Sequence, residues 1–201
     1  MVFPFSVAVS FYSATVISIL NTIHDSKSSV QAIAAVASNR VIGDGGRLPW
    51  SIAADWRHFM QRTVNSALIM GRVSFEDMLN EPRWAADGRT YHVVSRERRF
   101  ANLGPVSVHS SPMEALAAAK AEQRTVWICG GADIYLQLLS ECDRLWLTLV
   151  QKEFTGDTYF PHWQGEFPLC HELQIAEENG LKFTFTVWDK AAKLAANGQE
   201  A

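Results

Sequence analysis

The sequence predicts a single α/β domain in which helices cover a mainly parallel sheet that has an antiparallel C-terminal edge. From Val30 to Cys142, short apolar runs alternate with stretches of helical spacing, a pattern typical of helices packed on a parallel sheet. After Cys142 the helical spacing stops and three strand-like runs follow. The length of 201 residues suits one domain with a single core, and the 48% apolar content excludes a disordered chain.

The individual elements follow from these patterns in chain order. Strand-like runs rich in apolar or β-branched residues are VQAIAAVA (30–37), ALIMG (67–71), YHVVS (91–95), TVWICG (125–130), RLWLTLV (144–150), CHELQIAEE (170–178) and LKFTFTVWDK (181–190). Helical spacing is found in AADWRHFMQRTV (53–64), PMEALAAAKAEQ (112–123) and ADIYLQLLSE (132–141). Asn179-Gly180 lies between the last two strand-like runs and predicts a hairpin there.

The two ends of the chain lie outside this pattern. Residues 2–23 carry no formal charge and fourteen of them are apolar, which approaches the length of a membrane span. Pro4, Asn21 and six Ser or Thr residues interrupt the run, and no Lys or Arg precedes it as in a secretory signal. Membrane contact is therefore the less favoured interpretation. We expect residues 1–29 to form an apolar extension with a polar linker, residues 30–190 the domain, and residues 191–201 a C-terminal tail.

Charge and cysteine content exclude several classes of protein. With 18 basic and 21 acidic side chains the net charge is −3, so the basic footprint of a nucleic-acid-binding protein is missing. The three cysteines are widely spaced without a C-x-x-C motif, and the six histidines are scattered, so we expect neither disulfides nor a metal site. These features favour a reducing compartment, and we expect a cytoplasmic protein.

Four segments, in this order, carry a resemblance to a known family. They are ASNRVIGDGGRLPWSIAADWRHF (37–59), LIMGRVSFEDM (68–78), ICGGADIY (128–135) and LWLTLVQKEFTGDTYFP (145–161). Together they resemble dihydrofolate reductase, and the resemblance runs from Val30 to Lys190. It implies an eight-stranded sheet with four helices, and a monomeric enzyme that reduces dihydrofolate with NADPH in a cleft at the strand ends.

The candidate catalytic residues lie in the first and last of these segments. Asp55 falls in the first turn of a predicted helix, where a carboxylate often only complements the helix dipole. Phe59 at i+4 shares its face, and a carboxylate beside an aromatic wall suits a flat heterocycle that donates two parallel hydrogen bonds. The resemblance implies that Asp55 binds the pterin, that Thr148 hydrogen-bonds this carboxylate, and that Trp50 positions a water that protonates N5. The alternatives are a core tryptophan and a routine strand threonine.

Glycines mark the candidate cofactor site. Gly130 and Gly131 follow a strand and open a helix, so the backbone can approach a pyrophosphate closely at the helix N-terminus. The resemblance implies a cis peptide between them. The segment from Asn39 to Leu48 contains three glycines without the G-x-G-x-x-G spacing, and it resembles a mobile loop over the nicotinamide; a plain surface turn is the alternative.

Further ligand contacts are implied by the resemblance alone. Gly71 and Ser74 are expected at the cofactor phosphates, Arg72 at its 2′-phosphate, and Ser95 and Arg96 beside its adenosine. The remaining expected contacts are Ala35, Ile42, Ile134 and Tyr135 with the cofactor and Ile33 with the substrate.

One further residue, Arg89, matches the family pattern, and two residues depart from it. Arg89 matches an arginine that clamps the α-carboxylate of the substrate's glutamate tail, a task suited to a planar bidentate donor. Asp133 stands where many relatives have an arginine, which either weakens cofactor binding or leaves the phosphates to Arg72 and Arg96. Cys129 replaces a branched aliphatic residue. Two other functions stay open: a reductase of a ribosylated pyrimidine with the same fold, and a membrane-tethered or catalytically silent binding module.

Overall fold

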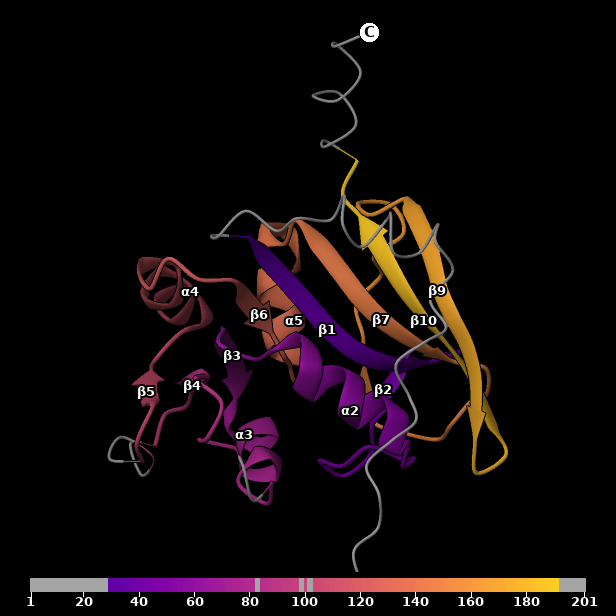
Figure 1. The fold of residues 1–201 in the computed structure, drawn as a ribbon, viewed down its shortest axis with the longest axis horizontal. Coiled ribbons are helices and arrows are strands. Elements are labelled where there is room, and N and C mark those ends of the chain that lie inside the picture. The colour runs from indigo at the N-terminus through magenta and orange to yellow at the C-terminus, as the bar shows by residue number, and fades with distance from the viewer. Residues whose placement is uncertain (1–28, 82–83, 98–99, 101–102, 192–201) are drawn as a thin grey trace, which may run out of the picture.

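An eight-stranded sheet forms the centre of the molecule (Figure 1). The computed structural model describes residues 29–81, 84–97, 100 and 103–191. The strands of this sheet are β1 (Val30–Ala37), β3 (Ala67–Gly71), β4 (Thr90–Val94), β5 (Val106–His109), β6 (Val126–Ile128), β7 (Arg144–Val150), β9 (Leu169–Glu178) and β10 (Leu181–Asp189). Their order is β5-β4-β3-β6-β1-β7-β10-β9. All neighbours from β5 to β7 are parallel and β10 is antiparallel to both β7 and β9, which confirms the predicted fold class.

The position of each strand in the sheet explains its sequence. β1 lies between two parallel neighbours, and its residues are almost all buried because both faces are covered. β9 lies at the edge, where no residue is fully buried. The turn that joins β9 to β10 has positive φ at Asn179 (53°) and Gly180 (74°), as in the predicted hairpin.

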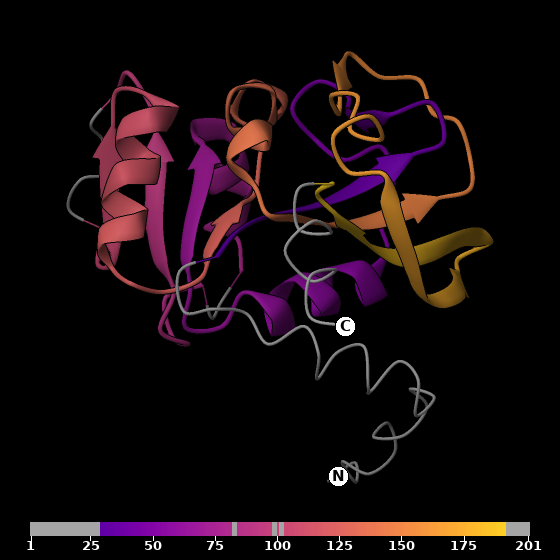
Figure 2. The same ribbon diagram turned by 90° about the horizontal axis from the view of Figure 1, so that it is seen from above.

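Helices cover both faces of the sheet, two on each. The helices are α2 (Ala53–Arg62), α3 (Arg72–Met78), α4 (Pro112–Ala121) and α5 (Ala132–Leu138), and α5 continues as a 3-10 turn, Leu139–Glu141. Side chains of α4 and α5 pack with Ile69 of β3 in one core cluster, whereas Phe59 of α2 and Phe75 of α3 pack with Leu68 and Met70 in another. Successive residues of β3 therefore point to opposite faces, and Figure 2 shows α2 and α5 on opposite sides of the sheet.

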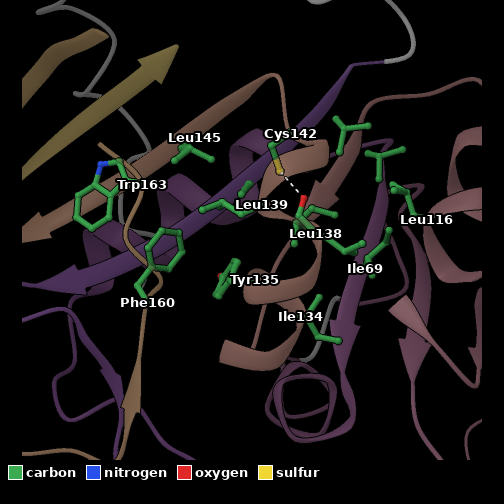
Figure 3. Packing of buried hydrophobic residues seen from close by; sticks show 14 of the residues in the cluster. Ile69, Leu116, Ile134, Tyr135, Leu138, Leu139, Cys142, Leu145, Phe160 and Trp163 are labelled. Carbon is green, nitrogen blue, oxygen red and sulfur yellow. Dashed lines mark hydrogen bonds between the residues drawn. The ribbon is translucent and has the colours of Figure 1, made fainter. Parts of the chain in front are cut away.

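The core under α5 fixes the start of that helix. Tyr135 and Leu138 of α5 lie between Ile69 and the aromatic rings of Phe160 and Trp163 (Figure 3). The Tyr135 hydroxyl also donates a 2.6 Å hydrogen bond to the backbone carbonyl of Ile33 in β1. Because this bond links the first turns of α5 to the middle of the sheet, the peptide before the helix is held beside β1.

The structure adds elements that the sequence pattern did not predict. β2 (Val41–Gly43) and β8 (Thr158–Tyr159) form a separate antiparallel pair, and β5 was likewise not predicted. Helix α2 ends at Arg62, two residues earlier than predicted, where the backbone N–H of Thr63 caps it on the carbonyl of Phe59. The predicted extension and tail, residues 1–28 and 192–201, lie outside the described residues. Among the described helices, none has the length and apolar character to cross a membrane.

Candidate active site

A cavity of about 960 Å³ opens at the carboxyl ends of the parallel strands. Residues at or after the ends of β3, β4 and β6 line it, together with the middle of β1 and the first turns of α2, α3 and α5. This is the edge at which open α/β sheets bind ligands. The predicted site residues that line it are Ile33, Ala35, Ile42, Asp55, Phe59, Gly71, Arg72, Ser74, Ser95, Arg96, Gly131, Ile134 and Tyr135. Four predicted site residues do not line it: Trp50, Arg89, Gly130 and Thr148.

Asp55 is a half-buried carboxylate in the wall of this cavity. It lies in the first turn of α2, whose N-cap residue Ile52 makes no side-chain cap. Glu178 of β9 supplies the cap instead, accepting hydrogen bonds from the backbone N–H of Ala53 (2.6 Å) and Ala54 (3.0 Å). This contact fixes the start of α2 against the sheet. The turn that carries Asp55 is thereby held in place.

The electrostatics of Asp55 depend on its burial and on one hydroxyl. Desolvation raises the pKa of the Asp55 carboxyl from 3.8 to about 6, and a side-chain hydrogen bond from Thr148 opposes this rise. Thr148 is buried in β7, opposite Ala35 of β1 and Phe185 of β10. Its hydroxyl stabilises the charged form of Asp55, because a hydrogen bond donated to a carboxylate lowers its pKa. The structure thus brings Thr148 to Asp55 without exposing it to the cavity.

An aromatic wall lies one helical turn beyond Asp55. Phe59 is on the same face of α2, and the ring of Trp56 stacks on it with centroids 5.4 Å apart and an interplanar angle of 20°. The Trp56 indole N–H donates a 3.1 Å hydrogen bond to Glu81, beyond the C-terminus of α3. Trp56 was not among the predicted site residues. Its position beside Asp55 and three residues before Phe59 was the signal available.

Trp50 is buried and does not line the cavity. Its ring is buried and packs on Phe154, with centroids 4.9 Å apart. Within the described residues its indole nitrogen has no hydrogen-bond partner, a feature shared by Trp127 and Trp163. The nitrogen is therefore available to donate a hydrogen bond to a water.

The glycine-containing segment is tied to a second chain segment that the sequence analysis did not place at the site. Asp44 and Arg47 exchange backbone hydrogen bonds of 2.8 and 3.1 Å, which closes a tight turn at the two intervening glycines. The Asp157 carboxylate accepts a 3.1 Å hydrogen bond from the backbone N–H of Gly45, and β2 pairs with β8. Residues of both segments line the cavity, so this turn forms one of its rims.

Two strand-to-helix turns meet at the opposite end of the cavity. The backbone N–H of Gly71 donates a 2.7 Å hydrogen bond to the carbonyl of Gly130, so the starts of α3 and α5 lie side by side. The Gly130-Gly131 peptide is cis, as the resemblance implies. Gly130 has a φ of 94°, and a Cβ there would lie 2.7 Å from the Tyr135 ring, so only glycine fits. Gly130 shapes the turn, and Gly131 faces the cavity.

Charged side chains line the cavity near these turns. Arg72 pairs with Glu76 one helical turn later through contacts of 2.9 and 3.1 Å, and Arg96 is exposed at the rim. Asp133 also lines the cavity in the first turn of α5 and places a negative charge there.

Residues at the start of α4 form another part of the cavity wall, and none of them was a predicted site residue. Ser110, Ser111 and Pro112 line the cavity. Ser111 caps the helix through a 3.2 Å bond from the backbone N–H of Glu114, and the Glu114 side chain reaches back to Ser110. A Ser-Pro-x-Glu start of a helix after a strand was a readable signal. The described residues contain no group of three or more potential metal ligands.

Arg89 differs most from its expected position. It precedes β4, its side chain is fully buried, and it does not line the cavity. It forms an ion pair with Asp87, donates a 2.8 Å hydrogen bond to the Thr63 hydroxyl and donates another to the backbone carbonyl of Met60. These partners hold the guanidinium behind the last turn of α2. The expectation that Arg89 faces the substrate is therefore not met in this structure.

Comparisons with known proteins agree with this arrangement. A family model described as dihydrofolate reductase matches residues 29–190. Dihydrofolate reductase of Lactococcus lactis is 32% identical over 150 residues, 73% of this chain and 88% of that protein. Dihydrofolate reductase type 3 of Salmonella typhimurium is 36% identical over 134 residues, 67% of this chain and 79% of that protein. A solved structure of dihydrofolate reductase from Enterococcus faecalis, complexed with NADP(H) and RAB-propyl, matches with a TM-score of 0.69 at 28% identity, covering 82% of this chain and 98% of that one.

Proposed function

Because this chain belongs to the dihydrofolate reductase family, we propose that it reduces 7,8-dihydrofolate to 5,6,7,8-tetrahydrofolate with NADPH. The observation that carries this proposal is Asp55, a half-buried carboxylate with a pKa raised to about 6, between an aromatic wall and the glycine turns. A titratable group of this kind in a cleft is typical of a catalytic site. The competing reduction of a ribosylated pyrimidine has no feature here that favours it.

The substrate end suits a flat, polar heterocycle. In its ionised form Asp55 can accept two parallel hydrogen bonds, as the N3–H and 2-amino groups of a pterin donate. Ile33 and Phe59 line the cavity near this carboxylate and offer apolar surfaces to the faces of the ring. Ionic recognition at one edge and apolar contact over the faces fix the orientation of the pterin.

The residues at the other end fit NADPH. The backbone at Gly71 and Gly131 leaves room for a pyrophosphate, Ser74 and Ser95 offer hydroxyls, and Arg72 and Arg96 offer positive charge for a 2′-phosphate. Ala35, Ile42, Ile134 and Tyr135 line the same space and form its apolar walls. When bound, NADPH supplies the hydride that reduces C6 of the pterin.

We assign the protonation of N5 to a water and not to Asp55 itself. A carboxylate bound to the N3 and 2-amino edge of the pterin cannot reach N5, so its contribution is electrostatic stabilisation of the protonated ring. Thr148 assists by holding Asp55 in its charged form. In this mechanism Trp50 uses its unpaired indole N–H to position the water, and the segment from Asn39 to Leu48 closes over the site to exclude bulk solvent.

We place this reaction in the cytoplasm and expect a monomer. The three cysteines are all free, which suits a reducing compartment. Cys142 is buried, Cys129 is partly buried and Cys170 is exposed.

Oxidation of NADPH on addition of dihydrofolate, followed by absorbance, tests the proposed function. The wild-type protein should consume NADPH only when dihydrofolate is present, and Asp55→Asn should lower the rate on the order of 10²-fold or more at neutral pH. Circular dichroism of the variant controls for loss of fold. No turnover by a folded wild-type protein would refute the proposal, and near-normal turnover by Asp55→Asn would remove Asp55 from the mechanism.

A further inference from the structure

The helix that carries Asp55 begins without a cap from its own segment of the chain. Ile52, the N-cap residue of α2, has an apolar side chain that accepts no hydrogen bond. The backbone N–H of Asp55 bonds to the Ile52 carbonyl (3.1 Å), which leaves the N–H groups of Ala53 and Ala54 without a partner in the helix. Glu178 accepts from both, Ala53 at its Oε1 and Ala54 at its Oε2. Because both carboxylate oxygens are used, Glu178 fixes the direction of the first turn as well as its position.

A β-bulge in β9 determines which glutamate faces this turn. In β10, Phe185 pairs with Gln174 of β9. The next residue, Thr186, pairs with Glu172, so Leu173 is an extra residue on the edge strand. Side chains alternate between the two faces of a strand, and one extra residue exchanges the faces for all residues beyond it.

The exchange of faces brings Glu178 to α2. Beyond the bulge, Ala176 lies opposite Phe183 of β10 and packs with it in the core cluster at the start of α2. Glu178 is the next residue on this face, whereas Glu177 is exposed and Ile175 is 66% exposed. Without the bulge, the alternation from the start of β9 would place Ile175 and Glu177 on this face instead. The exposed isoleucine is thus a consequence of the register that directs Glu178 to the helix.

The same pair of strands also supports the second contact of Asp55. β10 lies between β9 and β7, and its residue Phe185 is paired with Thr148 of β7 (Figure 1). Thr148 forms the side-chain hydrogen bond to Asp55. Glu178 therefore holds the helix turn while Thr148 meets the carboxylate on that turn, and the register of β7, β10 and β9 fixes the two relative to each other.

We propose that Glu178 is a positioning residue for the reduction of dihydrofolate, because it holds the first turn of α2 where the Asp55 carboxylate meets both Thr148 and the pterin. This inference rests on the proposed function. Glu178 does not line the cavity, so it acts through Asp55 and not on the substrate itself. Its effect falls on substrate binding and turnover, whereas the cofactor end of the cavity is built on α3 and α5 and stays in place.

Steady-state kinetics of Glu178→Ala test the inference. We expect kcat/KM for dihydrofolate to fall by about tenfold or more, since a misplacement of about 1 Å in a catalytic group can cost on the order of 10²-fold. KM for NADPH should stay within about twofold of the wild-type value. Glu178→Gln keeps one acceptor oxygen, so it should recover part of the loss and leave a decrease of about threefold. Glu177→Ala is the matched control, because it removes the same charge from the neighbouring exposed residue and should change neither constant.

A second substitution separates positioning of Asp55 from a general loss of stability. Thr148→Val should lower kcat/KM in the wild type but have little further effect in Glu178→Ala, where Asp55 no longer meets the hydroxyl. Circular dichroism and NADPH binding control for fold. Equal effects of Thr148→Val in both backgrounds, or an unchanged kcat/KM for dihydrofolate in Glu178→Ala, would overturn the inference. If Glu178→Ala does not fold, an unchanged kcat/KM in Glu178→Gln would overturn it instead, whereas no turnover by the wild type would overturn the proposed function.

Discussion

Replacing Asp55 by asparagine should make the protein more stable at neutral and alkaline pH while lowering its activity on the order of 10²-fold or more. The Asp55 carboxyl has a pKa near 3.8 when exposed and about 6 in the folded protein. Between these values the native state binds more protons than the unfolded state, so stability falls as pH rises. The contribution is fully present below pH 3.8 and is lost as pH rises through about 6.

The size of the effect follows from the two pKa values. Because a pKa difference of one corresponds to about 1.36 kcal/mol, a difference of about 2 corresponds to about 3 kcal/mol of unfolding free energy. Asp55 is only half-buried, so solvent screening reduces this value, and we expect about 2 kcal/mol. Asparagine has the same shape and never carries the buried charge. Asp55→Asn should therefore gain about 2 kcal/mol over the wild type at about pH 8, and this gain should vanish near pH 4.

Urea unfolding followed by circular dichroism, at several values from about pH 4 to about pH 8, measures this difference without ligands. Asp77→Asn is the matched control, because Asp77 lines the same cavity but is exposed and loses little hydration. The reasoning is refuted if the stability difference between Asp55→Asn and wild type is the same at every pH, since burial of a charge at Asp55 would then cost nothing.

Three further predictions test other parts of the site. Thr148→Val removes the hydrogen bond that lowers the Asp55 pKa, so that pKa should rise above about 6 and the pH–rate profile should shift to higher pH. Thr148→Ser keeps a hydroxyl and should leave the profile unchanged, and an unshifted profile in Thr148→Val would contradict this contact. Arg72→Ala and Arg96→Ala should each reduce the preference for NADPH over NADH by about tenfold or more in kcat/KM, and equal use of both cofactors by the wild type would contradict the assignment. Deletion of residues 1–28 should leave kinetics and circular dichroism unchanged, and a truncated protein that fails to fold would show that the domain needs this segment.

The strands and helices that were predicted correctly are those whose sequence pattern follows directly from how they are buried in the fold. β3 is a continuous apolar run and β1 is apolar except for Gln31, because both lie in the middle of the sheet with helices on both faces. Helix α2 combines an i, i+4 pattern with Asp55 and Phe59 on one face, and both line the cavity as expected. In these elements the local pattern and the tertiary environment agree.

The missed elements depend on partners far away in the chain. β2 and β8 have three and two residues, which is too short for a periodic pattern, and they exist because Val41 and Gly43 pair with a segment more than 100 residues later. β5 has four residues and lies at the edge next to β4, so its burial is incomplete and its pattern weak. Pairing of this kind leaves little local signal.

Arg89 shows why a matched residue type does not establish a role. The residues Asp87-Gly88-Arg89 carry the matched arginine, but its availability depends on the φ angle of Gly88, on Asn65 beside it and on the end of α2. A fully buried arginine is uncommon and requires a partner, and here the partner is the acidic residue two positions earlier. The same three-residue turn thus determines both the burial of the cation and its neutralisation. The sequence predicts the residue type at this position, whereas the partners of its side chain include the end of α2, which lies outside the three-residue motif.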